Sequence, residues 1–193
     1  CNRQTMTALY DNIIFGPIRS RRLGLSRGVN LLPVESKLCS FDCIYCECGW
    51  NDEHPGKRRF NAREDVYNML DKTLAQMVAD GTPPDVITFA GNGEPTMHPD
   101  FEQIIDFTIR LRDQYAPNAK ISVLSNATQL HREGVRNALH KVDNAILKLD
   151  SAIDATAKAI NKPQGNYSVE RVMEQLKDFG REFVLETMFL RGE

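Results

Sequence analysis

Patterns typical of buried strands and of amphipathic helices alternate along this chain of 193 residues. Short apolar runs typical of strands occupy residues 29–33, 85–90, 120–125, 144–150 and 183–190. Helical spacing of apolar positions occupies residues 61–80, 100–114, 131–141 and 169–179, with Asn61 as the expected N-cap of the first helix. Strands joined by helices require right-handed crossovers and a mainly parallel sheet. The sequence therefore predicts an α/β fold with about five strands, either barrel-like or doubly wound.

Polar and reactive residues recur where the expected strands end. A cysteine-rich segment follows the first strand, residues 91–95 follow the second, Asn126 follows the third, and Asp150 and Ser151 follow the fourth. The carboxyl ends of parallel strands meet at one edge, where α/β folds place their functional sites. We therefore expect these residues to lie close together.

Cys39, Cys43 and Cys46 form a C-x3-C-x2-C run in a polar segment. Thiolates at this spacing can bind three irons of a four-iron cluster and leave the fourth iron open to a substrate or cofactor. A structural zinc site is the alternative, with Cys48 or His54 as its fourth ligand, and inert buried cysteines are a third interpretation. The chain has no second, well-separated ligand couple downstream, which favours the iron–sulfur interpretation.

Composition limits the class of protein. With 41% hydrophobic residues and no low-complexity stretch, residues 1–193 are expected to form one domain. No apolar run is long enough to span a bilayer, no signal peptide is recognisable, and five clustered cysteines do not resemble a disulfide framework, so we expect a cytoplasmic protein. The formal net charge is −2, although residues 16–63 carry nine Lys and Arg against five Asp and Glu. This balance gives no support for nucleic-acid binding.

Residues 91–95, with the sequence Gly-Asn-Gly-Glu-Pro, form a second motif. Two glycines allow a turn that a ligand can approach closely, and Glu94 can bind an ammonium group, although the segment alone is also compatible with a simple turn. A C-x3-C-x2-C loop after the first strand, followed one strand–helix unit later by G-x-G-E-P, resembles the radical S-adenosylmethionine (SAM) superfamily. The resemblance covers most of the chain. The run at residues 15–24 is similar to an iron–sulfur oxidoreductase branch distantly similar to the tRNA wyosine-synthesis radical enzymes.

The resemblance implies a fold, a reaction and cofactors. The fold would be a partial (β/α) barrel with about five to six mainly parallel strands. Cys39, Cys43 and Cys46 would hold a [4Fe-4S] cluster whose open iron binds SAM. Reductive cleavage of SAM would generate a 5′-deoxyadenosyl radical that abstracts hydrogen from a substrate. A low-potential electron donor such as flavodoxin or ferredoxin would supply the electron. The alternative function is a non-catalytic zinc-binding module that uses these three cysteines and Cys48.

The resemblance also implies residues that contact SAM. Tyr45 occupies a position whose backbone contacts the adenine. The glycine-rich turn would bind the methionyl ammonium through Gly91, Gly93, Glu94 and Pro95. Asn126, Asp150 and Ser151 occupy positions that commonly contact the ribose or the carboxylate. The chain departs from the family because it lacks a sixth strand and helix at its C-terminal end, so we expect truncation or an open barrel. Cys48 is also additional, and we expect it to be a free thiol.

Five charged residues are candidates for substrate binding. Lys148 and Glu186 each fall inside an expected strand, where a charged side chain is unfavourable unless it is paired, solvated or bound to a ligand. Arg19, Arg21 and Arg22 can form forked contacts to a phosphate or carboxylate. The alternative for Lys148 and Glu186 is that they face a rim or bridge each other, and the alternative for the arginines is a solvated turn. If the arginines do line the site, the substrate is anionic.

Overall fold

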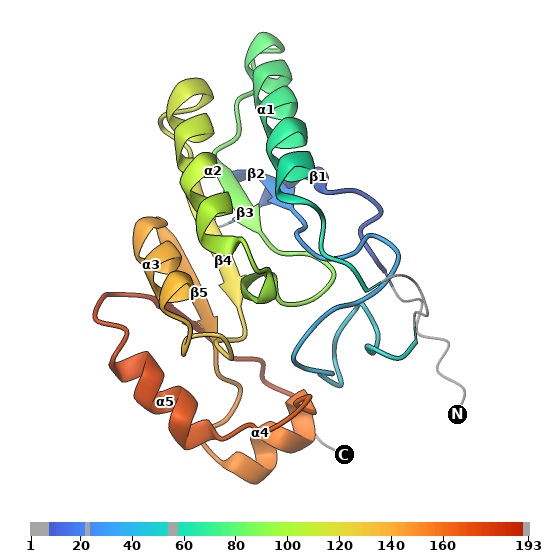
Figure 1. Ribbon diagram of the computed structural model, residues 1–193, viewed down its shortest axis with the longest axis vertical. Helices are drawn as coiled ribbons and strands as arrows, with labels where there is room; N and C mark the ends of the chain where they lie inside the picture. Colours follow the sequence, from blue (N-terminus) through green and yellow to red (C-terminus); the bar gives the residue numbers. More distant parts are fainter. Residues whose placement is uncertain (1–7, 22–23, 54–57, 191–193) are drawn as a thin grey trace.

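The fold is an α/β half-barrel built on one six-stranded sheet (Figure 1). The computed structural model describes residues 8–21, 24–53 and 58–190. The strands lie in chain order: β1 (Ile14–Ser20), β2 (Gly24–Val29), β3 (Val86–Phe89), β4 (Lys120–Ser125), β5 (Asn144–Lys148) and β6 (Val184–Glu186). β1 pairs with β2 in antiparallel fashion, and all other neighbours are parallel. β1 and β6 form the two edges, so the sheet is open and the expected partial barrel is confirmed.

Three helices cover one face of this sheet. α1 (Arg63–Ala79), α2 (Phe101–Tyr115) and α3 (Glu133–Lys141) lie side by side, with α2 in contact with both neighbours (Figure 1). A short 3-10 helix, η1 (Pro95–Met97), precedes α2. α4 (Asp154–Asn161) and α5 (Val169–Lys177) lie at the other end of the molecule, beyond the strand β5 (Figure 1). None of the helices in the described residues is long and apolar enough to cross a membrane.

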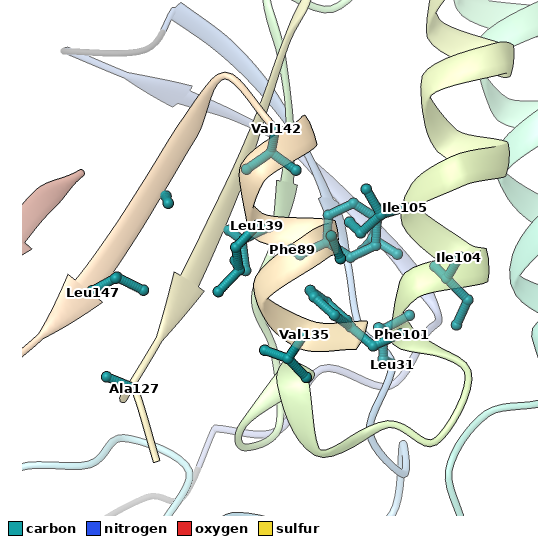
Figure 2. Packing of buried hydrophobic residues seen from close by; sticks show 14 of the residues in the cluster. Leu31, Phe89, Phe101, Ile104, Ile105, Ala127, Val135, Leu139, Val142 and Leu147 are labelled. Carbon is teal, nitrogen blue, oxygen red and sulfur yellow. The ribbon is translucent and has the colours of Figure 1, made fainter. Parts of the chain in front are cut away.

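The two faces of the sheet differ because side chains alternate along each strand. Ile87 and Phe89 of β3 are fully buried in the core, whereas Thr88 between them lines a cavity on the opposite face. Phe89 packs edge-on against Phe101 of α2, and Figure 2 shows further residues of this core from α2, α3 and β5. The helices therefore stabilise the sheet from one side and leave its concave side available for ligands.

Most of the predicted elements are present, although the position of the first strand and the start of the first helix differ from the prediction. The strand expected at residues 29–33 is misplaced, since it shares only Val29 with β2, and the Asn30 side chain then accepts hydrogen bonds from Leu32 N and Asn92 N. The prediction of Asn61 as N-cap is wrong, since Ala62 occupies that position. The Asn61 amide instead donates to the carbonyls of Asn30 and Leu32, which joins α1 to the segment after β2.

Two elements were not predicted, and one is shorter than expected. Gly16 and Pro17 interrupt the pattern of β1, which contains an irregularity between Phe15 and Ile18. α4 buries little apolar surface, since only Ala157 and Asn161 are buried along it, so its periodicity is weak. The strand expected at residues 183–190 pairs with β5 over residues 184–186 alone.

Candidate functional site

A cavity of about 180 Å³ lies where the cysteine loop, residues 37–51, meets the carboxyl ends of the strands. Its lining includes nine of the residues predicted from sequence: Cys39, Cys43, Tyr45, Cys46, Gly93, Glu94, Asn126, Lys148 and Glu186. Phe41, Leu124 and Ser125 complete it. Side chains from the loop, from the turn after β3 and from the ends of β4, β5 and β6 therefore face one space, as expected for the functional edge of a parallel sheet.

The turn after β3 is joined to the cysteine loop through the backbone. Leu38 and Gly93 form an isolated parallel bridge, in which Leu38 N donates to Asn92 O (2.9 Å) and Glu94 N donates to Leu38 O (3.1 Å). The space beside Gly91 is filled by the Asn30 side chain. The sequence predicts that these glycines let a ligand approach. In the structure they accommodate neighbouring parts of the same chain, and they thereby fix the first cysteine next to Glu94.

Glu94 is buried in this turn, with 2% of its surface exposed. One carboxylate oxygen accepts hydrogen bonds from the backbone N–H and the hydroxyl of Thr96, and the other accepts from Asn126 N (2.6 Å). Burial raises the pKa of Glu94, and these hydrogen bonds oppose that rise. Glu94 therefore joins the turn after β3 to the end of β4, and it retains acceptor capacity for a ligand in the cavity.

Asn126, at the end of β4, contacts the cysteine loop. Its side-chain amide donates to Ser40 Oγ (2.9 Å) and lies 3.7 Å from Cys39 Sγ. Its carbonyl oxygen accepts from the hydroxyl of Thr128, which in turn contacts Ser40 (2.7 Å). The predicted site residue Asn126 is thus a polar link between the first cysteine and the sheet.

Lys148, on β5, connects the second cysteine to the opposite side of the cavity. Its ammonium donates to Tyr45 Oη (2.6 Å), Asp150 Oδ2 (2.9 Å) and Cys43 Sγ (3.3 Å). The Tyr45 hydroxyl also donates to Asp150 (2.6 Å), and the Asn161 amide of α4 donates to Asp150 and to Cys43 Sγ (3.4 Å). The charge of Lys148, which would be unfavourable alone inside a barrel, is therefore paired with Asp150.

A second lysine lies underneath the cysteine loop. Lys37 is 1% exposed, and its ammonium donates to Gly49 O (2.7 Å) and Asp42 Oδ1 (3.1 Å). Asp42 accepts from both the backbone and the side-chain N–H groups of Asn51, and the Asn51 amide exchanges hydrogen bonds with the backbone of Cys39. Burial alone would lower the pKa of Lys37, but the sulfurs of Cys46 and Cys39 and the Asp42 carboxylate raise it overall. No pattern in the sequence predicts this buried pair.

The thiols differ in how readily they lose a proton. A hydrogen bond from the Cys48 thiol is the main cause that lowers the pKa of Cys46 to about 6, with burial opposing it and the Lys37 ammonium adding to it. The same hydrogen bond raises the pKa of Cys48. Burial raises the pKa of Cys39 to about 12. Cys46 is therefore the thiolate of the Cys46–Cys48 pair, and Cys48 keeps its proton.

These donors fit a cluster better than a single metal ion. Among the residues that the structure describes, no three His, Cys, Asp or Glu side chains are grouped closely enough to hold one metal ion. The alternative of a zinc module with Cys48 is thus not supported, and its other candidate ligand, His54, lies outside the described residues. Cys39, Cys43 and Cys46 instead line a common cavity. Three thiols facing one cavity are a suitable donor set for an iron–sulfur cluster.

Several predicted residues lie outside the lining of this cavity. Gly91 packs against the Asn30 side chain, Pro95 begins η1, and Asp150 contacts Lys148 and Tyr45. Ser151 accepts a hydrogen bond from Ile153 N at the start of α4. Arg19 and Arg21 are exposed on β1 and just after it, and Arg22 lies outside the described residues.

A larger cavity of about 840 Å³ occupies the concave side of the sheet. All six strands contribute to its lining, with apolar residues such as Phe15, Leu124 and Ile146 and uncharged polar residues such as Thr88 and Asn144. Glu186 lines both this cavity and the one at the cysteines. The two cavities are therefore neighbours.

Comparison with known protein families agrees with this geometry. The family model of the radical SAM superfamily matches residues 36–193, which include every lining residue of the cysteine cavity. This chain belongs to the radical SAM superfamily. Radical SAM proteins use a [4Fe-4S] cluster and SAM, so these are the cofactors of the family to which the site belongs.

Relatives of this radical SAM protein are found among both sequences and structures. The UPF0026 protein MJ1312 of Methanocaldococcus jannaschii is 31% identical over 183 residues, which are 92% of this chain and 54% of the relative. The chain thus spans about half the length of that relative. A radical SAM methyltransferase from Sphaerobacter thermophilus (TM-score 0.59, 13% identity, 84% of this chain and 46% of that chain) shares the fold. So does anSMEcpe with bound AdoMet (TM-score 0.55, 19% identity, 83% of this chain and 43% of that chain).

Proposed function

We propose that the chain carries the radical-generating domain of an enzyme, in which Cys39, Cys43 and Cys46 hold a [4Fe-4S] cluster. The observation that carries this proposal is the convergence of these thiols, Glu94 and Lys148 on one cavity at the carboxyl ends of the strands. When bound, the cluster and SAM supply a 5′-deoxyadenosyl radical for hydrogen abstraction. A low-potential donor such as flavodoxin or ferredoxin provides the electron.

Different residues of the cavity would contact different parts of SAM. Glu94 would accept a hydrogen bond from the methionyl ammonium, beside the backbone of Gly93. Lys148 and Asn126 would provide donors for the carboxylate or ribose oxygens, and the backbone near Tyr45 would contact the adenine. Support for this assignment is that Gly93, Glu94, Asn126 and Lys148 all line the cavity with the thiols. Asp150 positions Lys148 and Tyr45 through hydrogen bonds of 2.9 and 2.6 Å.

The substrate binds in the larger cavity on the concave side of the sheet. Its volume of about 840 Å³ is in the range of small-molecule sites, and Glu186 marks the junction with the cysteine cavity. The described lining offers apolar and uncharged polar groups together with Glu186, and it includes no lysine or arginine. This favours a largely apolar substrate or substrate segment. The assignment of Arg19, Arg21 and Arg22 to an anionic substrate rests on the sequence alone.

Anaerobic reconstitution with iron and sulfide tests the proposal. The reconstituted protein should contain four irons and four sulfides per chain, absorb broadly in the visible range, and produce 5′-deoxyadenosine from SAM when dithionite is added. The control is the same sample without dithionite. A protein that binds zinc in place of a cluster, or a reduced cluster that leaves SAM intact, would refute the proposal.

A further inference from the structure

Lys37 is a buried, charged side chain that lines neither cavity. Its side chain is 1% exposed, and it is absent from the lining of both the cysteine cavity and the larger cavity. The loop encloses its ammonium, which donates to Gly49 O at 2.7 Å and to Asp42 Oδ1 at 3.1 Å. A substrate or SAM molecule in either cavity therefore does not meet this side chain. Its charge therefore lies inside the cysteine loop and outside both cavities.

Lys37 and Asp42, the two members of the buried ion pair, have different surroundings. The Lys37 ammonium lies inside the loop that carries the cysteines, where it contacts Asp42 and Gly49 on either side of Cys43 and Cys46 in the sequence. The Asp42 carboxylate is directed to amide donors, since Oδ1 accepts from Asn51 N (2.8 Å) and Oδ2 accepts from Gln164 Nε2 (2.8 Å). These donors spread the negative charge of Asp42 over neutral groups. The loop that carries the three cysteines therefore encloses one buried cation, Lys37, and one buried anion, Asp42.

We propose that Lys37 is a fixed positive charge that raises the reduction potential of the cluster at Cys39, Cys43 and Cys46, and that Asp42 limits this rise. The inference rests on the proposed function. When a donor transfers one electron to the cluster, the site gains one negative charge, and a buried cation stabilises the reduced form more than the oxidised form. Net charge near a cluster is among the factors that set its potential, and burial strengthens the interaction.

Redox titrations with dithionite, monitored by the EPR signal of the reduced cluster, test this inference. In Lys37→Met, the ratio of reduced to oxidised cluster at a fixed solution potential should fall about tenfold, equivalent to ~59 mV for a one-electron couple. In Asp42→Asn, the ratio should rise, because Lys37 keeps its charge and loses its counterion. Lys141→Met is the matched control, since Lys141 pairs with Glu102 and Asp106 on the helix-covered face and should not change the midpoint.

The opposite directions separate an electrostatic role from a structural one. Both single replacements break the same ion pair, so a purely structural role would change both midpoints in the same direction or leave both unchanged. Either result would overturn the inference. Because Lys37→Met leaves Asp42 buried without its partner, the double variant K37M/D42N is measured as well, and its midpoint should lie between those of the single variants.

The test also distinguishes this inference from the proposed function. If the wild-type protein forms no cluster, the proposed function fails. If the wild-type cluster forms and Asp42→Asn has a midpoint at or below that of wild type, the inference about Lys37 fails and the proposed function stands. If Lys37→Met does not retain iron, the Asp42→Asn result and the double variant still decide the question.

Discussion

The carbonyl oxygen of Leu38 occupies the position next to Gly93 where any other residue would place its side chain. A Cβ atom at residue 93 would lie 1.9 Å from that oxygen, and the backbone there has φ of +140°. Gly93 thus allows the turn after β3 to contact the residue directly before Cys39. The close approach of these two backbones brings a cysteine and Glu94 into one cavity.

Gly93→Ala should therefore separate the turn from the cysteine loop. Gly165 is a matched control, because its φ is +113° but no atom lies within 4 Å of a Cβ built there. Backbone strain alone should destabilise Gly165→Ala by about 1–3 kcal/mol. Gly93→Ala should lose more stability than this and should also lose iron, because the overlap with Leu38 forces the backbone to move. Chemical denaturation and iron analysis of both variants measure the difference, and equal effects would contradict the argument.

Replacement of Cys39, Cys43 or Cys46 by alanine should abolish cluster binding. Cys48→Ala should retain it, because Cys48 keeps its proton and acts as a donor toward Cys46. The Cys48 variant should also show a higher pKa for Cys46 in the iron-free protein, since it removes the main cause of the lowered value. Iron and sulfide contents after anaerobic reconstitution decide the first point, and thiol reactivity against pH decides the second. Loss of iron in Cys48→Ala equal to that in the other variants would contradict the three-ligand assignment.

Glu94→Gln should weaken SAM binding by about one to two orders of magnitude, because a charge-assisted hydrogen bond is worth about 1.5–3 kcal/mol. The amide also lacks one of the acceptor oxygens that Thr96 and Asn126 use, so a moderate loss of stability should accompany the change. Equilibrium binding of SAM to the reconstituted variant gives the affinity, with iron content as the control. An unchanged affinity would exclude Glu94 from the SAM site.

Stability should fall below about pH 6.5 because of His98. The ring is buried, its Nδ1 accepts from Asp100 N (3.0 Å) and its Nε2 lies 2.9 Å from Asn61 O, which fixes the neutral form. Burial lowers the pKa of His98. The unfolded chain therefore binds this proton first as the pH decreases, and unfolding becomes easier by at most about 1.4 kcal/mol per pH unit until the pH passes the folded pKa. His98→Gln should reduce this slope in denaturation experiments between pH 7 and pH 5.5. An identical slope in the variant would show that other groups cause it.

Much of the site could be predicted because strand order places the ends of parallel strands together. Cys39, Glu94 and Asn126 are far apart in the sequence, yet each follows a predicted strand, and they meet at one cavity. Ser151 also follows a strand, but it accepts a hydrogen bond at the start of α4. Position at a strand end predicts proximity to the site, whereas the direction of the side chain depends on the local turn.

Lys37 and the roles of the glycines could not be predicted for a different reason. No periodicity distinguishes a lysine enclosed by its own loop from a solvated lysine, because the enclosing partners, Asp42 and Gly49, form no recognisable motif. The motif at Gly91 and Gly93 was recognised, but sequence alone does not reveal that Asn30 and Leu38 fill the adjacent space. Both depend on how distant segments pack.

The hydrogen bonds of Asn126 have a consequence for electron transfer. Its backbone N–H holds Glu94, and its amide holds Ser40 and approaches Cys39. The loop, the turn after β3 and the end of β4 are thus cross-linked by preorganised dipoles, which need little rearrangement when the charge in the cavity changes. A cluster held by Cys39, Cys43 and Cys46 in such a frame would have a low reorganisation energy, because the surrounding groups would move little when it gained or lost an electron.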